Sequence, residues 1–355
     1  MSLTLYVDGD RWRNHLREVV DREPRLVPVA KGNGYGFGLG RLARKSAWLG
    51  VDTIAVGQYD EIAEVEQRFP GSILVLSPWR PFAASAGSSD ASADPRVIHT
   101  IGRPKDLEQL RQRAGDARPR VVLELLTSMR RHGFGAAGLR AAARDLAGVT
   151  LEGVALHLPL GTSGHLAEVE RLMTDVVSAG LAYDPRSRTI WVSHLSAVEL
   201  TALRGSWSDF TFRPRVGTGL WLGDRGALEV RATVLDTHPI ARGDQFGYRG
   251  RSAPRKGTLL VVSGGTAHGI GLEAPTGDAS LRARAGSIAR GGLDAAGFVR
   301  SPYTVDGKPR LFAEPPHMQA SMLFLPAGAE VPEVGDEVVV RVRYTATDVD
   351  DVVLG

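Results

Sequence analysis

Short apolar runs recur along the first part of the sequence, and stretches with helical spacing of their apolar residues separate most of them. The apolar runs lie at residues 26–30, 53–56, 73–76, 97–101, 121–126, 151–158, 189–193 and 210–216. The helical stretches lie at 40–49, 60–68, 104–114, 136–146, 166–179 and 197–203. Strands that alternate with helices over about 200 residues are typical of a closed parallel barrel. We therefore predict an α/β protein with an N-terminal (β/α)8 TIM barrel.

The hydrophobic pattern changes after about residue 223. The segments 228–235, 257–263, 322–325 and 337–343 have the composition of strands, and Gly and Pro turns separate them without a strong helix between. This pattern predicts a β-rich C-terminal domain. We place the domains at 1–225 and 226–355, and we expect the isolated strand at 3–7 to join the C-terminal domain.

Composition narrows the class of protein. The 43 Lys and Arg residues barely exceed the 40 Asp and Glu residues, and the arginines are interleaved with acids, so no nucleic-acid footprint is predicted. With no cysteine, disulfides, thiolate metal sites and cysteine nucleophiles are excluded, and no metal site is predicted. No apolar run approaches the length of a membrane span, and the N-terminus does not resemble a signal peptide. We expect a soluble, cytoplasmic protein with no membrane partner.

Candidate chemistry gathers where the predicted barrel strands end, which is where this fold places its active sites. Lys31 ends an apolar run, and burial there would favour the neutral amine, the form that makes Schiff bases. A lysine is also common at a strand end simply because the chain leaves the core there. The polar and glycine residues at these ends are Lys31, Tyr35, Arg131, His157, His194, Ser196, Arg215, Gly217 and Thr218. Together they favour a functional Lys31 and a phosphate pocket after the eighth strand.

Four of these segments resemble motifs of the alanine racemase family, which are pyridoxal-phosphate (PLP) enzymes with an N-terminal barrel and a C-terminal β domain. Segment 29–36, VAKGNGYG, is similar to the family's V-x-K-A-N-A-Y-G. Segments 127–134 (TSMRRHGF), 153–157 (GVALH) and 215–221 (RVGTGLW) resemble D-T-G-M-x-R-x-G-F, E-G-x-x-T-H and R-x-G-I-A-L-Y. The resemblance covers nearly the whole chain.

The resemblance implies a role for each matching residue. It implies PLP as cofactor, with Lys31 as the Schiff-base lysine and first proton-transfer base. Arg131 would reach the cofactor phenolate and the substrate carboxylate. The remaining cofactor contacts that it implies are His157 beside the pyridine ring, Arg215 opposite the pyridine nitrogen, and Tyr35, Ser196, Gly217 and Thr218 at the phosphate.

The resemblance fails where the family supplies its second base, a tyrosine in a G-Y-A-D-G loop of the neighbouring subunit. Segment 265–269 reads GTAHG, with Thr266 for the tyrosine and His268 for the aspartate. We expect a homodimer, with His268 as the replacement base because an imidazole titrates near neutrality. Other groups that could serve are Tyr248, His317 and Tyr303.

Two more substitutions concern the surroundings of the site. The family's C-M-D-Q segment reads HMQA at 317–320, with Gln319 for an aspartate, and Glu124 replaces a lysine that relatives often carbamylate. A carboxylate at Glu124 can orient Arg131 as a carbamate does. The family's last segment, which carries an entrance tyrosine, has no counterpart after residue 352. We expect a differently shaped entrance.

Three functions fit this sequence. The first is a PLP-dependent amino-acid racemase or epimerase that acts on an amino acid. The second is a one-base PLP reaction, either decarboxylation or α-proton exchange, although the related decarboxylases usually carry a catalytic cysteine. The third is a PLP-binding homologue without catalytic activity.

Overall fold

The computed structural model describes residues 2–82, 91–161, 164–185, 187–272 and 299–355. The chain divides into two compact units. One unit is Arg13–Gly223, and the other combines Met1–Trp12 with Asp224–Gly355. Helix α1, Gly9–Arg22, begins in the second unit and continues in the first.

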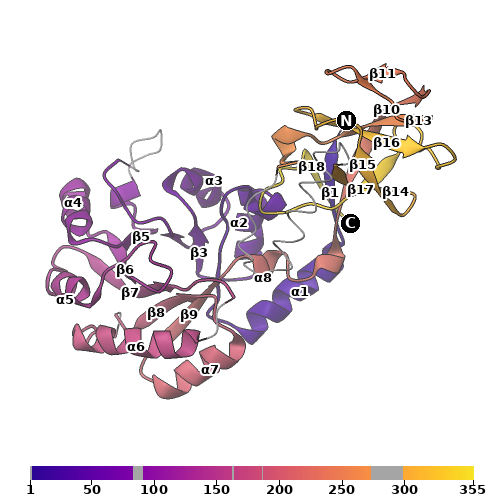
Figure 1. The fold of residues 1–355 in the computed structure, drawn as a ribbon. Coiled ribbons are helices and arrows are strands. Elements are labelled where there is room, and N and C mark those ends of the chain that lie inside the picture. The colour runs from indigo at the N-terminus through magenta and orange to yellow at the C-terminus, as the bar shows by residue number, and fades with distance from the viewer. Residues whose placement is uncertain (1, 83–90, 162–163, 186, 273–298) are drawn as a thin grey trace. The chain divides into compact units, whose positions relative to one another are not determined.

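The first unit is an eight-stranded parallel sheet closed into a barrel, as the alternating pattern predicted (Figure 1). Its strand order is β2-β9-β8-β7-β6-β5-β4-β3, and a parallel bridge between Val29 and Ala55 joins the two ends of that order. The strands are β2 Val27–Pro28, β3 Thr53–Val56, β4 Ser72–Val75, β5 Val97–Ile101, β6 Arg120–Leu125, β7 Thr150–His157, β8 Thr189–Ser193 and β9 Thr211–Val216.

Helices follow the barrel strands and lie outside them (Figure 1). They are α2 Leu39–Trp48, α3 Ile62–Glu66, α4 Pro104–Ala114, α5 Ala136–Arg144, α6 His165–Ser178, α7 Ala197–Ser206 and the short α8 Thr218–Trp221. Helix α4 begins with a proline at its first turn, where the missing N–H costs nothing. The barrel core is apolar and takes residues from neighbouring strands: Val27, Val29, Ala55, Leu74, Ile98, Val122, Ala155 and Trp191.

The second unit is a mostly antiparallel sheet of eight strands, in the order β13-β16-β15-β14-β17-β10-β1-β18. Strand β13, the first in this order, pairs with the long strand β10 as well as with β16, so it has a partner strand on both sides. The strands are β1 Leu3–Val7, β10 Leu228–Ile240, β13 Gly257–Ser263, β14 Arg300–Val305, β15 Lys308–Phe312, β16 Ala320–Pro326, β17 Glu337–Val340 and β18 Asp351–Leu354. A small hairpin pairs β11 Gln245–Phe246 with β12 Arg251–Ser252.

The predicted fold class, a (β/α)8 barrel followed by a β-rich domain, is confirmed. Strand β1 lies between β10, to which it is antiparallel, and β18, to which it is parallel. The sequence pattern missed β14 and β15, which each contain a proline, and β18, which has only four residues. In the described part of the chain, no helix has both the length and the apolar character needed to cross a bilayer.

Candidate active site

Lys31 follows β2 at the carboxyl end of the barrel strands, called the open end of the barrel below. The backbone just before it is fixed on both sides, because the N–H of Val29 donates to Val216 O at 2.9 Å and that of Ala30 to Ala55 O at 2.8 Å. The residue is accessible to solvent, yet desolvation of its amine lowers the pKa of Lys31. The positive charge of Arg131 lowers it further, and the negative charge of Glu61 raises it. Desolvation and the charge of Arg131 both shift the amine towards its neutral form.

Glu61 holds the loop that carries Lys31, a role that no sequence motif indicated. One carboxylate oxygen accepts the N–H of Gly32 at 2.6 Å. The other accepts the N–H groups of Gly57 at 2.5 Å and Gln58 at 3.1 Å. The side chain thereby ties the loop after β2 to the loop after β3, beside the lysine. A glutamate in the first turn after a strand is common in protein sequences. Only the folded structure therefore reveals the role of Glu61.

Tyr35 lies in a short 3₁₀ turn, Gly34–Gly36, with a left-handed backbone at φ 57°. Its side chain is buried, and its hydroxyl lies against Gly217, where a Cβ atom would collide with it. Burial, and then the charge of Glu61, raises the pKa of the Tyr35 hydroxyl to about 12. The hydroxyl therefore keeps its proton and can donate a hydrogen bond at the turn where α8 begins.

Two charged groups are buried inside the barrel. Arg215 is 5% exposed and donates from one guanidinium nitrogen to Leu156 O at 2.8 Å. Burial lowers the pKa of Arg215 to about 10, which leaves the guanidinium positive near neutrality. Glu124 is 3% exposed, and burial raises the pKa of its carboxyl to about 7 despite the opposing charges of Arg215 and Arg131. Among the described residues, Arg215 Nε and Glu124 Oε2 have no hydrogen-bond partner.

Two histidines face each other at the ends of β7 and β8. The ring centroids of His157 and His194 lie 5.2 Å apart, with the rings tilted by 55°. Desolvation, followed by the charge of Arg215, lowers the pKa of His157 to about 3, and the same two causes lower the pKa of His194. Both rings are therefore neutral near pH 7.

Arg131 lies on a loop after β6, and hydrogen bonds hold this loop at two points. The hydroxyl of Thr127 donates to His157 O at 2.6 Å, which joins the loop to the end of β7. The N–H of Ser128 donates to Glu168 of α6 at 2.5 Å, and the Ser128 hydroxyl donates to the same carboxylate at 2.7 Å. Arg131 itself is exposed, so its guanidinium is free to meet a ligand on a fixed loop.

Ser196 and Thr218 occupy different settings. Ser196 caps helix α7: its Oγ accepts the N–H of Glu199 at 3.3 Å and donates to the Glu199 carboxylate at 2.8 Å. Its hydroxyl is thus already engaged in a capping box. Thr218 is exposed at the first position of α8, directly after Gly217. The first N–H groups of a helix have no intrahelical acceptor, so this turn can donate to an anion.

The predicted second-base residues lie in the C-terminal unit, in the short 3₁₀ turn Thr266–His268. Thr266 is half-buried, and its N–H donates to His317 O at 2.8 Å. His268 Nδ1 accepts the N–H of Gly265 at 3.2 Å, and Nε2 lies 3.1 Å from Asp350 Oδ1. Both ring nitrogens of His268 are therefore engaged in contacts within the domain.

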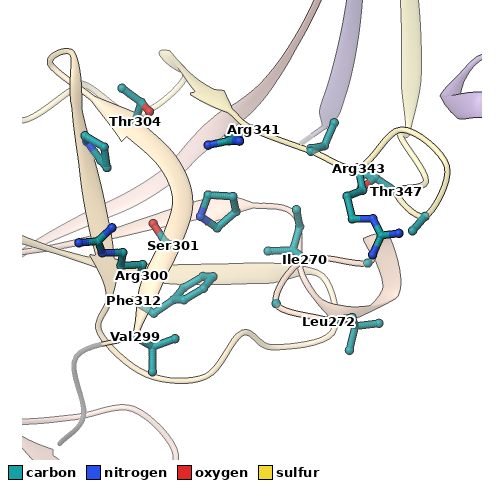
Figure 2. Close-up of a pocket in the computed structure, with 16 residues that line it drawn as sticks. Ile270, Leu272, Val299, Arg300, Ser301, Thr304, Phe312, Arg341, Arg343 and Thr347 are labelled. Atoms are coloured by element: carbon teal, nitrogen blue, oxygen red, sulfur yellow. The ribbon is translucent and has the colours of Figure 1, made fainter. Parts of the chain in front are cut away.

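A cavity of about 630 Å³ lies in the same unit (Figure 2), and its lining includes Gly269, the residue directly after His268. Residues 269–272 form one wall, and Phe312 contributes an apolar side chain. Three arginines, Arg300, Arg341 and Arg343, also line it, and its described lining contains no acidic residue. None of the residues predicted from the barrel motifs or from the 265–268 loop belongs to this lining.

Comparisons with known proteins agree on one family. The model of the family "Alanine racemase, N-terminal domain" matches residues 7–220. An alanine racemase of Nitratidesulfovibrio vulgaris is 27% identical over 267 residues, which are 69% of this chain and 69% of that protein.

Solved structures extend the likeness to the whole fold. An alanine racemase from Bartonella henselae with covalently bound pyridoxal phosphate has a TM-score of 0.67 at 18% identity, covering 98% of each chain. A histidine racemase from Leuconostoc mesenteroides has a TM-score of 0.66 at 18% identity, covering 95% of this chain and 87% of its own.

Proposed function

The chain belongs to the alanine racemase family, and on that premise we propose that it is a PLP-dependent enzyme that moves the α-proton of an amino acid, as a racemase or epimerase does. The observation that carries this proposal is the pairing of Lys31, an amine with a lowered pKa, with Tyr35 and Gly217 at the same end of the barrel. Lys31 supplies a nucleophile and base, and Tyr35 and Gly217 supply a phosphate site.

The residues at the barrel end fit this cofactor. Gly217 and the Tyr35 hydroxyl form a close-fitting turn beside α8 that suits a phosphate group. Arg215 has a buried Nε without a partner among the described residues, which suits an acceptor nitrogen on a flat ring. Lys31 would hold the cofactor covalently, and His157 would lie beside the ring. When bound, pyridoxal phosphate supplies an electron sink that makes the proton on an amino acid's α-carbon acidic.

Arg215 bears on the kind of reaction. Its guanidinium stays positive near neutrality even with a pKa lowered to about 10. A permanent cation opposite the pyridine nitrogen keeps that nitrogen unprotonated and weakens the electron sink. A weaker sink favours brief removal and return of the α-proton over chemistry at the side chain. Arg215 thus supports a racemase or epimerase.

Lys31 and Arg131 would share the work on the barrel side. The lowered pKa of Lys31 raises the share of neutral amine that can accept the α-proton on one face of the substrate. Arg131, on a loop fastened to His157 and Glu168, would bind the substrate carboxylate and hold the α-carbon in place. Glu124 lies close enough for the charge of Arg131 to act on its carboxyl, which suits a role in orienting that arginine.

The opposite face needs a group from the C-terminal domain of a second copy of this chain. Exposed apolar residues support a homodimer: Leu160 and Met129, on loops at the open end of the barrel, are 79% and 38% exposed. On the C-terminal domain, Tyr248 and Met318 are 85% and 73% exposed. In the family this second group is a tyrosine, and here the corresponding turn carries Thr266 and His268. That substitution also favours a second candidate, a one-base proton exchange or decarboxylation by Lys31 alone.

Deuterium exchange tests this proposal. The purified protein, reconstituted with pyridoxal phosphate, is incubated in deuterated water with single enantiomers of a panel that includes alanine and histidine. We expect deuterium at the α-carbon together with the opposite enantiomer, and loss of both when Lys31 is replaced by alanine. Lys45→Ala, on helix α2, is the matched control.

Each alternative has its own result in the same experiment. Deuterium gain with retained configuration would identify the one-base reaction, and release of CO₂ would identify a decarboxylase. Bound cofactor without exchange for any amino acid would point to a non-catalytic homologue and end the racemase proposal.

A further inference from the structure

Two histidines of the C-terminal domain lie next to Thr266. This residue occupies the position of the tyrosine that serves as second base in the family. His268 ends the same turn, and His317 accepts the N–H of Thr266 through its carbonyl oxygen at 2.8 Å. The contacts of their ring nitrogens differ, and these contacts determine which of the two histidines can exchange a proton with a ligand.

His268 is built into the domain. The N–H of Gly265 can only donate, so Nδ1 of His268, 3.2 Å away, accepts that bond and carries no proton. The ring proton is then on Nε2, which donates to Asp350 Oδ1 at 3.1 Å. The other oxygen of Asp350 accepts the N–H of Leu3 at 2.7 Å, so the chain of contacts reaches β1. With 13% of its side chain exposed and both nitrogens engaged, His268 can accept a proton only by giving up its bond to the turn.

His317 has the opposite arrangement. Its Nε2 lies 2.6 Å from Oε1 of Glu314, a carboxylate that is 3% exposed. The second oxygen of Glu314 accepts the N–H of Tyr248 at 3.1 Å, which fixes the carboxylate. The ring of His317 packs against the Tyr248 ring, with centroids 4.5 Å apart.

The carboxylate selects the tautomer of His317, because a proton on Nε2 is the one that can be donated to Glu314. The lone pair is then on Nδ1, which has no hydrogen bond to any described residue. The side chain is 26% exposed, and Met318 and Gln319 beside it are exposed as well. A base oriented by a buried carboxylate, with its other nitrogen open, is a recurring arrangement in proton transfer.

We propose that His317, positioned by Glu314, is the proton-transfer residue that the C-terminal domain contributes in place of the family's tyrosine. This inference rests on the proposed function. In one direction Nδ1 of His317 takes the proton from the α-carbon, and the ammonium of Lys31 returns a proton to the opposite face. In the other direction the two residues exchange these tasks, so no proton is gained or lost overall.

The first test uses the apoprotein and does not depend on turnover. Diethyl pyrocarbonate modifies unprotonated, accessible imidazole nitrogens, and peptide mass spectrometry reports the rate at each histidine. We expect His317 to react several-fold faster than His268. The Glu314→Gln variant should change the ring tautomer of His317 seen by ¹⁵N NMR while leaving that of His268 unchanged. A faster reaction at His268 than at His317 would overturn the assignment.

The closing test follows α-deuterium exchange from each enantiomer separately in the holoenzyme. His317→Gln should slow exchange from one enantiomer by about 100-fold or more and leave exchange from the other, which depends on Lys31. Glu314→Gln should give a smaller loss on the same enantiomer, as expected for a positioning residue. His268→Gln should lower the melting temperature and keep exchange from both enantiomers.

The outcomes separate the two proposals. If the wild-type holoenzyme exchanges no α-proton, the proposed function fails, and this inference fails with it. If the wild type exchanges both enantiomers and His317→Gln, with unchanged circular dichroism and cofactor absorbance, does so equally well, only the assignment of His317 is overturned. Selective loss of one enantiomer in His268→Gln would move the role to that residue.

Discussion

The hydroxyl oxygen of Tyr35 lies where the side chain of residue 217 would begin if that residue were not glycine. The contact joins the loop after the first barrel strand to the turn before α8, two segments at opposite ends of the barrel sequence. The close contact depends on both residues. Tyr35 adopts a left-handed backbone, and residue 217 has no Cβ atom to collide with the tyrosine hydroxyl.

Gly217→Ala should therefore weaken cofactor binding by displacing the Tyr35 hydroxyl. Loss of a hydrogen bond to a charged group costs about 1.5–3 kcal/mol, which corresponds to a roughly ten- to hundredfold rise in the Kd for pyridoxal phosphate. An absorbance titration of the apoprotein measures it. Gly219→Ala is the control, because its Cβ would meet only Val216 at 3.4 Å. Equal affinities of the two variants would contradict the expected role of Tyr35.

Glu61→Gln should lower the pKa of Lys31 further. The carboxylate is the neighbouring charge that raises this pKa, and an amide removes the charge while keeping one acceptor for the loop N–H groups. The pH dependence of Lys31 acylation in the apoprotein, followed by mass spectrometry, should shift to lower pH. Glu64→Gln is matched to it, since Glu64 also accepts a backbone N–H, that of Gly40 at 2.7 Å. No shift in Glu61→Gln, or the same shift in both, would show that Glu61 only shapes the loop.

Glu124 should make the protein less stable as the pH rises. Its pKa is about 7 in the fold against 4.5 ordinarily, so the folded state holds the proton more tightly. Its contribution is fully present below about pH 4.5 and is lost as the pH passes 7, a total of about 3 kcal/mol. Denaturant unfolding at pH 5 and pH 8 should show most of that loss in the wild type and not in Glu124→Gln. Glu152→Gln, on the neighbouring strand β7, should keep the wild-type pH dependence.

Tyr303→Phe should destabilise the protein without changing α-proton exchange. This tyrosine is fully buried, and its hydroxyl donates to the carbonyl oxygens of Ser263 and Gly264 at 2.9 and 2.8 Å. Gly264 O would keep the hydroxyl of Ser321 at 2.7 Å, but Ser263 O would lose this donor. A buried acceptor that loses its donor costs about 1–3 kcal/mol. Unfolding and exchange measurements on the same preparation test both statements. Loss of exchange in a variant that remains folded would return Tyr303 to the candidates for the second base.

The barrel was predictable because its strands are short apolar runs and helices follow most of them. The lysine and glycine motifs mark its first and last loops. The C-terminal sheet was harder to predict, since β14 and β15 contain Pro302 and Pro309, and β15 also carries two charged residues in five. Within the candidate site, residue types pointed to Lys31 and Arg215, whereas the contacts of Glu61 and Glu314 depend on backbone N–H groups that only the fold brings near. The sequence placed His268 ahead of His317 because His268 lies in the segment that matches the family's tyrosine loop. The ring contacts on which we base the opposite proposal are visible only in the fold.

The position of β1 sets the order in which the two units can be completed during synthesis. Leu3 pairs with Ala232, and Thr4 pairs with Asp351, so the first strand emerges from the ribosome long before either neighbour exists. The whole barrel can fold in that interval, while β1 remains an unpaired strand edge. Strand β18, at the edge of the C-terminal sheet, pairs with β1 only after all the other strands of that sheet have been made. A ribosome-bound chain truncated after the barrel should therefore expose β1 to proteases while its barrel is already protected.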